Sequence, residues 1–224
     1  MYKCAVIGLG SIGLRSIDSH CCAYRDCDQT ELVATCDTDW TPQDCFRYDF
    51  QKKYNSYMEM VSVEELDIVS VCTSVETHCQ IVCDIAPFVK AIYSEKPIAP
   101  TLKEADKMIE ICHKYGVILQ VNHQRRFVKP KMRWSRGLLN NGTHAFDLIR
   151  QLDLVDKVDM EYIDSMDYPP IFELQITQEQ MILKGVEHLV ECLKAGKESI
   201  SSGEEARETL KAVLDYERNR QNSQ

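Results

Sequence analysis

Apolar runs and helical spacings alternate along the first 122 residues of this chain. Short runs that are β-branched or apolar throughout predict strands at 3–7, 31–36, 67–73, 89–94 and 117–121. Apolar residues three to four positions apart predict helices between them, near 11–22, 42–54, 76–86 and 102–115. Strands without polar alternation are typical of parallel sheets covered on both faces. The pattern therefore predicts a Rossmann-type, doubly wound α/β domain over residues 1–122, with ligands at the carboxyl ends of its strands.

The pattern changes after residue 122 and no longer alternates regularly. The predicted elements are a helix, two β-like runs and two further helices, at 143–152, 158–165, 171–177, 178–195 and 203–219. We expect a small, reduced α+β domain over residues 123–224. The second β-like run has an apolar face that could pair with its own copy, so a homodimer is one expectation; the face is made of Ile171, Phe172, Leu174 and Ile176.

A glycine triad follows the first predicted strand directly, as Gly8-Leu9-Gly10-Ser11-Ile12-Gly13. Strand, triad and helix in this order predict a pyrophosphate-binding turn, in which Gly8 permits the turn, Gly10 lets phosphate approach and Gly13 lets the helix pack closely. Asp37 follows the second strand, 24 residues after Gly13, where a carboxylate can accept hydrogen bonds from a ribose. Since that carboxylate would repel a 2′-phosphate, NAD is predicted in preference to NADP.

Composition narrows the class of protein. The 224 residues are 44% hydrophobic with a formal net charge of −9, which disfavours nucleic acid and anionic membranes as partners. The densest basic stretch, from Lys129 to Arg136, fits either a local anion site or a solvated linker. No apolar run approaches the roughly 20 residues that span a bilayer, and no export signal is evident, so we expect a cytoplasmic protein. The eleven cysteines lie mostly in apolar patterns without a CxxC pair, which predicts buried thiols and no metal site.

Polar residues at the strand ends are the candidates for chemistry. The third strand ends in Thr73, with His78 on the helix after it, and the fourth ends in Glu95-Lys96-Pro97. A lysine beside a nicotinamide can hold a substrate hydroxyl and stabilise a developing alkoxide. An isolated lysine is more often simply a solvent-facing charge, so the position of Lys96 alone does not decide its role.

These motifs together resemble the Gfo/Idh/MocA family, which includes glucose-fructose oxidoreductase and inositol dehydrogenase. The resemblance covers residues 1 to about 152, and residues 185–216 look like the family's C-terminal helices, which return to the nucleotide domain. It rests on the glycine triad, residues 73–78, Glu95-Lys96-Pro97, residues 122–127 and residues 140–147. It implies NAD(P)-dependent oxidation or reduction of a CH–OH carbon in a sugar, cyclitol or nucleotide-sugar.

The resemblance also implies roles for individual residues. Lys96 matches the family's catalytic lysine, and His144 matches its acid/base histidine, a residue type whose ordinary pKa suits proton exchange at cellular pH. Asn140 joins them in the catalytic group. The implied cofactor contacts are Gly8, Gly10, Ser11, Ile12, Gly13, Asp37, Thr73, His78, Glu95 and Lys96, and the implied substrate contacts are Arg126, Asn140 and Asp147.

Two departures from the family pattern keep an alternative open. Many members have Asp where this chain has Asn140, and an amide can orient a hydroxyl but cannot share a proton. Only 13 residues separate Phe127 from Asn140, and two clear β-like runs replace the family's broad second sheet. The alternative is a non-catalytic dinucleotide-binding sensor, or a degenerate family member that acts through association.

Overall fold

The computed structural model describes residues 1–39, 52–127, 131–134, 159–162, 172–174 and 181–222. Its main feature is a six-stranded parallel sheet with strand order β3-β2-β1-β4-β5-β6. The strands are β1 (Tyr2–Ile7), β2 (Thr30–Cys36), β3 (Lys52–Tyr54), β4 (Ile68–Val71), β5 (Ala91–Ser94) and β6 (Ile118–Val121). This order is that of a dinucleotide-binding Rossmann sheet, which confirms the predicted fold class.

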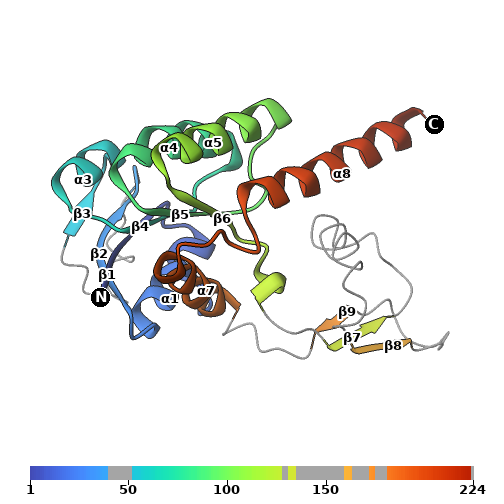
Figure 1. Ribbon diagram of the computed structural model, residues 1–224, viewed down its shortest axis with the longest axis horizontal. Coiled ribbons are helices and arrows are strands. Elements are labelled where there is room, and N and C mark those ends of the chain that lie inside the picture. Colours follow the sequence, from blue (N-terminus) through green and yellow to red (C-terminus); the bar gives the residue numbers. More distant parts are fainter. Residues whose placement is uncertain (40–51, 128–130, 135–158, 163–171, 175–180, 223–224) are drawn as a thin grey trace.

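Helices cover both faces of the sheet (Figure 1). One face carries α3 (Tyr57–Val63), α4 (Val75–Ile85), α5 (Leu102–Tyr115) and α8 (Gly203–Asn222), and the other carries α1 (His20–Asp26) and α7 (Met181–Ala195). Alternate residues of β1 enter the two cores: Ala5 and Ile7 pack under the first group of helices, and Cys4 and Val6 under the second. Burial on both sides explains why the strands are apolar throughout.

Local signals in the sequence place α5 accurately. Thr101 caps its first turn, since Thr101 Oγ1 accepts a hydrogen bond from the Glu104 N–H at 3.3 Å and donates one to the Glu104 carboxylate at 2.6 Å. At the other end Gly116 adopts a left-handed conformation with φ 67°. The helix therefore spans the residues predicted from its spacing, 102–115.

The prediction of one helix over 11–22 is wrong. The chain forms a short π-helical turn over Ser11–Arg15, and α1 begins at His20, where Ser19 Oγ accepts the Cys22 N–H at 3.3 Å. Polar side chains between the two segments, in Ser16, Asp18 and Ser19, compete with the helix for backbone groups, which favours a break.

The helix predicted over 42–54 is wrong at its end, and the rest of it lies outside the described residues. Residues 52–54 form β3, a short edge strand paired with β2. Glu64 fixes this strand by accepting hydrogen bonds from Lys52 at 2.7 Å and from the Tyr54 hydroxyl at 2.5 Å. A strand with two lysines has no apolar pattern, so it is defined by tertiary contacts, among them those with β2 and Glu64.

A separate three-stranded sheet contains β7 (Lys131–Trp134), β8 (Asp159–Tyr162) and β9 (Phe172–Leu174), in the order β8-β7-β9. The last two lie within the predicted β-like runs. The first was missed because Lys131 and Arg133 give it the character of a basic stretch. The helix predicted near 143–152 lies outside the described residues, and the boundary at residue 122 stays a prediction.

Candidate functional site

The candidate site lies at the carboxyl edge of the six-stranded sheet. Gly8 follows β1, Asp37 follows β2, Thr73 comes two residues after β4, Glu95 follows β5 and Asn122 follows β6. Since parallel strands end at the same edge, residues far apart in sequence meet there. This edge brings together the glycine triad, Asp37 and the Glu95-Lys96 pair.

The three glycines meet different surroundings. Gly8 has φ +90°, and a Cβ added there would lie 2.7 Å from the carbonyl carbon of Cys72. A Cβ on Gly13 would lie 1.9 Å from the Gly8 carbonyl oxygen. At Gly10, by contrast, an added Cβ would meet no heavy atom within 4 Å. Gly8 and Gly13 therefore serve the packing of the loop itself, while Gly10 exposes its backbone to open space, as pyrophosphate binding requires.

The turn after the triad differs from the expected helix N-terminus. The Gly10 carbonyl accepts hydrogen bonds from the N–H groups of Leu14 and Arg15, both at 3.1 Å. The N–H groups of Ser11 and Ile12 precede these donors and have no acceptor within the turn. Backbone N–H groups of a short turn, rather than the dipole of a long α-helix, are thus the groups available to a phosphate.

Asp37 holds the glycine loop in place. Its Oδ2 accepts a hydrogen bond from the Leu9 N–H at 2.6 Å, and its Oδ1 accepts one from the Asp39 N–H at 3.0 Å. The spacing in the sequence predicted a ribose-binding carboxylate and missed this contact with the loop. Each carboxylate oxygen can accept more than one hydrogen bond, so the contact leaves capacity for a ribose hydroxyl.

His78 joins two loops at the site. The ring is buried, with Nε2 at 3.1 Å from the Thr73 carbonyl oxygen and Nδ1 at 3.2 Å from the Pro97 carbonyl oxygen. Whichever nitrogen is protonated therefore donates to a neighbouring loop. The imidazole predicted as a cofactor contact links the loop after β4 to the Lys96-Pro97 segment.

Glu95 and Lys96 are adjacent in sequence but differ in exposure. Lys96 is exposed, whereas only 7% of Glu95 is accessible. Glu95 Oε1 accepts hydrogen bonds from Asn122 Nδ2 at 2.6 Å and His20 Nε2 at 3.1 Å, and its Oε2 accepts the Lys96 N–H at 3.2 Å. Burial by itself would raise the pKa of Glu95, but these donors outweigh it, and the pKa lies below its usual range.

Sequence reasoning missed most of the partners of Glu95. His20 is completely buried and contacts Ser70, which lies inside the apolar strand β4. Single polar residues within apolar segments were the available signal, because buried polar groups in folded proteins are usually hydrogen-bonded. Which residue pairs with which could not be read from their positions in the sequence.

The predicted substrate contacts are only partly described. Asn140, His144 and Asp147 lie outside the described residues. The Arg126 side chain is 2% exposed, and its guanidinium donates to the Ile200 carbonyl oxygen at 2.7 Å and to the Glu205 carboxylate at 3.0 Å. In the structure Arg126 thus connects the segment after β6 to the start of α8.

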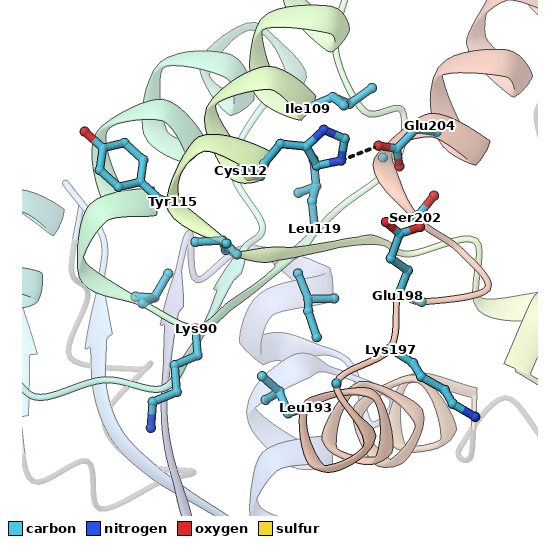
Figure 2. A pocket seen from close by; sticks show the side chains of 18 residues that line it. Lys90, Ile109, Cys112, Tyr115, Leu119, Leu193, Lys197, Glu198, Ser202 and Glu204 are labelled. Carbon is cyan, nitrogen blue, oxygen red and sulfur yellow. Dashed lines mark ion pairs between the residues drawn. The ribbon is translucent and has the colours of Figure 1, made fainter.

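A separate hollow of about 770 Å³ lies at the amino edge of the sheet (Figure 2). It is lined by the starts of β5 and β6, the ends of α5 and α7 and the start of α8, and the ion pair between His113 and Glu204 lies on it, with 2.8 Å between its atoms. None of the predicted site residues that the structure describes lines it, so the hollow is separate from the described part of the candidate site.

Two negative findings apply to the described part of the chain. No group of three or more His, Cys, Asp or Glu side chains there is arranged to hold a metal ion. None of the helices described has both the length and the apolar character needed to cross a membrane. The described cysteines are free thiols, all of them buried except the half-buried Cys83.

Comparison with protein families gives one match, to the Gfo/Idh/MocA family model described as "Oxidoreductase family, NAD-binding Rossmann fold". It matches residues 2–123, which is more than half of the chain. The matched segment contains the glycine triad, Asp37 and Glu95-Lys96-Pro97. It ends before His144.

Curated relatives include a D-apiose dehydrogenase from Paraburkholderia graminis, 33% identical over 128 residues, which are 56% of this chain and 33% of the relative. A myo-inositol 2-dehydrogenase from Thermotoga maritima is 31% identical over 143 residues, 63% of this chain and 41% of the relative. The alignments thus span between a third and somewhat under half of these relatives' length.

Solved structures share the fold. An aldose-aldose oxidoreductase from Caulobacter crescentus aligns with a TM-score of 0.75 at 16% identity, covering 100% of this chain and 98% of that one. An oxidoreductase from Agrobacterium radiobacter in complex with NAD+, L-tartaric acid and magnesium aligns with a TM-score of 0.73 at 15% identity. The alignment covers 95% of this chain and 94% of that one. At such identities the likeness establishes the architecture only.

Proposed function

The chain belongs to the Gfo/Idh/MocA oxidoreductase family, and we propose that it is an NAD-dependent dehydrogenase or reductase acting on a sugar, cyclitol or nucleotide-sugar. The reaction moves a hydride between the nicotinamide and a carbon that carries a hydroxyl or keto group. The observation that carries the proposal is the position of Gly10, Asp37 and Lys96 in loops at the same, carboxyl edge of a Rossmann sheet.

The residues at this edge fit a dinucleotide. Open space beside Gly10 and the N–H groups of Ser11 and Ile12 suit a pyrophosphate, and Asp37 suits the hydroxyls of the adenosine ribose. The Asp37 carboxylate at this position disfavours the 2′-phosphate of NADP. When bound, the nicotinamide supplies the site that accepts or returns the hydride.

The chain's own residues then have separate tasks. Lys96 places an exposed ammonium at the site, where a positive charge stabilises an alkoxide as the hydride leaves. His144 takes or returns the hydroxyl proton, and Asn140 orients that hydroxyl through its amide. Thr73 and His78 line the cofactor side, and Arg126 and Asp147 stay predicted substrate contacts.

The alternative, a dinucleotide-binding sensor without turnover, is less well supported. The curated relatives named above are dehydrogenases, and Lys96 follows β5 at the carboxyl edge with its side chain exposed. Binding of NADH is expected under both readings, so it does not separate them. Only the enzyme requires Lys96 and His144 for turnover.

The test compares Lys96→Ala and His144→Ala with Lys211→Ala, which removes an exposed lysine on α8. NADH affinity is measured by fluorescence titration, and turnover by nicotinamide absorbance with a panel of inositols, aldoses and UDP-sugars. We expect the first two variants to keep their NADH affinity within about threefold and to lose about 100-fold or more of kcat. Lys211→Ala should match the wild type. Turnover that survives loss of Lys96, or a panel that gives none with the wild type, would support the sensor.

A further inference from the structure

We propose that a buried chain of hydrogen bonds, from Tyr24 through Ser70 and His20 to Glu95, holds the backbone at Lys96 and makes His20 a positioning residue for the reaction. The inference rests on the proposed function, since it assigns a purpose to the placement of Lys96. It concerns residues from three elements of the fold, α1, β4 and the end of β5.

The contacts form one continuous series. The Tyr24 hydroxyl lies 2.7 Å from Ser70 Oγ, and Ser70 Oγ lies 2.8 Å from His20 Nδ1. On the other side of the ring, His20 Nε2 lies 3.1 Å from Glu95 Oε1. Glu95 Oε2 then accepts the N–H of Lys96 at 3.2 Å. Tyr24, Ser70 and His20 are all fully buried.

The chemistry of the groups fixes the direction of the hydrogen bond to Glu95. An ionised carboxylate can only accept, so His20 Nε2 carries a proton and donates the hydrogen bond to Glu95 Oε1. The Ser70 and Tyr24 hydroxyls can each donate or accept, so they complete the series on the Nδ1 side of the ring. Each polar atom in this dry region thus has a partner of the right kind.

The side chain of Asn122, directly after β6, also hydrogen-bonds to Glu95. The Tyr93 hydroxyl donates to Asn122 Oδ1 at 2.7 Å, which orients the amide so that Nδ2 donates to Glu95 Oε1 at 2.6 Å. Glu95 therefore accepts hydrogen bonds from His20 on α1 and from Asn122 after β6. The carboxylate has a defined position in the core, and so does the Lys96 N–H that it accepts.

The backbone is also held on the far side of Lys96, where the Pro97 carbonyl oxygen contacts buried His78 at 3.2 Å. Only the Lys96 side chain is left exposed between these two anchors. Burying a carboxylate costs free energy that apolar packing would not, so the contribution of this arrangement is geometric. Rate depends steeply on such placement, because small displacements of a charged group weaken its action on the transition state.

The test uses two substitutions of His20 that differ in which nitrogen they imitate. The amide nitrogen of Gln occupies a place like Nε2 and can donate to Glu95, whereas that of Asn lies nearer Nδ1 and reaches only toward Ser70. His20→Phe keeps the ring and removes both contacts. For each variant we measure kcat and NADH affinity with a panel of inositols, aldoses and UDP-sugars, and hydrogen exchange of the Lys96 amide by NMR without substrate.

We expect His20→Phe and His20→Asn to lower kcat by about tenfold or more and to speed exchange of the Lys96 amide, with NADH affinity nearly unchanged. His20→Gln should retain most of the wild-type kcat and most of the protection of the Lys96 amide from exchange. If His20→Phe does not fold, Ser70→Ala is the smaller change, and it should speed exchange and lower kcat severalfold. A purely structural histidine would make Gln and Asn equivalent, and that result, or an exchange rate that does not respond, would overturn the proposal. If the wild type turns over nothing, the proposed function fails, and the exchange rates alone decide whether His20 holds Lys96.

Discussion

At the scale of single residues, glycines in one loop are required for different reasons. Gly8 and Gly13 face protein atoms at distances that no Cβ tolerates, whereas Gly10 faces open space. The same residue type therefore serves folding at two positions, and at the third it leaves the space that the proposed cofactor needs. Substitution separates the two requirements.

We expect Gly8→Ala and Gly13→Ala each to destabilise the fold by about 2 kcal/mol or more, because a Cβ there meets backbone atoms, with a fall in Tm of about 5 °C or more. Gly10→Ala should leave Tm unchanged and weaken NADH binding at least tenfold, because its methyl group occupies the space of the phosphates. Thermal unfolding and NADH titration of the three variants check this. A Gly10→Ala protein with wild-type affinity would remove Gly10 from the cofactor site.

Asp37 gives the second prediction at this scale. Asp37→Asn keeps an oxygen that can accept the Leu9 N–H and removes the negative charge. We expect a Tm close to that of the wild type and a ratio of NADH to NADPH affinity that falls by about tenfold, because repulsion of the 2′-phosphate is lost. Titrations with both cofactors measure the ratio. An unchanged ratio would mean that Asp37 serves only to hold the glycine loop.

At the scale of elements, α7 depends on one glycine for its approach to the sheet. A Cβ on Gly185 would lie 2.1 Å from the Tyr93 hydroxyl oxygen, and the Gly185 carbonyl accepts a hydrogen bond from Gln120 at 2.9 Å. The α7 residues that face the sheet are fully buried, among them Ile182, Val186 and Leu189. The helix and the end of the sheet are therefore packed without spare room.

Gly185→Ala should accordingly lower Tm by about 5 °C or more, since α7 must move away from β5. Adding Tyr93→Phe removes the atom in closest conflict and should restore part of the loss, although it also removes the hydrogen bond to Asn122. Thermal unfolding of the two single variants and the double variant measures the coupling. Strictly additive effects would show that Gly185 and Tyr93 do not conflict.

The contact of α7 with the segment before α8 predicts a dependence on pH. His188 Nε2 accepts the Ile200 N–H at 3.2 Å and its ring lies 5.4 Å from that of Phe127, and burial lowers the pKa of His188 from the ordinary value of 6.5. As the pH falls, the unfolded chain is protonated at His188 near pH 6.5, whereas the folded chain is protonated only at a lower pH. The free energy of unfolding therefore falls as the pH decreases below about 6.5.

Denaturant unfolding at pH 7.5 and pH 5.5 tests the effect. The free energy of unfolding should fall between these values in the wild type and fall less in His188→Gln, whose side chain does not titrate. The carboxyls of Glu64, Asp67 and Glu95 have pKa values below their ordinary range, so their contributions are lost only at more acidic pH. If the free energy of unfolding falls equally in both proteins, groups other than His188 cause the pH dependence.

At the scale of the whole molecule, the two ends of the sequence build one α/β unit. Side chains of α7 share a core with β1 and α1, and Ala206 and Leu210 of α8 pack with α5 residues in the other core. The three-stranded sheet lies between these segments in the sequence. The Rossmann unit is therefore discontinuous along the chain.

We expect a protein in which a flexible linker of about ten residues replaces residues 128–180 to fold and to bind NADH with near wild-type affinity, because both cores are retained. It should have no turnover, because Asn140, His144 and Asp147 are absent. A chain ended after Phe127 should instead aggregate, since the surface that α7 covers becomes exposed. Circular dichroism, size-exclusion chromatography and NADH titration distinguish these outcomes. A folded linker variant that does not bind NADH would place part of the cofactor site within 128–180.

Local patterns in the sequence were sufficient for much of the α/β unit. The apolar strands, the glycine triad and the helix over 102–115 are each set by residues a few positions apart, and such interactions leave a readable period or spacing. The family resemblance depended on the same short motifs. The short strand β3 and the break between Ser11 and α1 were not predicted, because weak local preferences there yield to contacts with the rest of the fold.

Tertiary structure alone decided how the site is held. His20, Ser70, Glu95 and Asn122 come from four separate parts of the chain, and nothing in their spacing links them. They meet because the parallel sheet places β4, β5 and β6 side by side and α1 contacts β4 and β5, and burial then favours polar groups that find partners. The sequence by itself thus determined the apolar strands and the candidate residues at their ends, and folding determined which buried polar groups hydrogen-bond to Glu95.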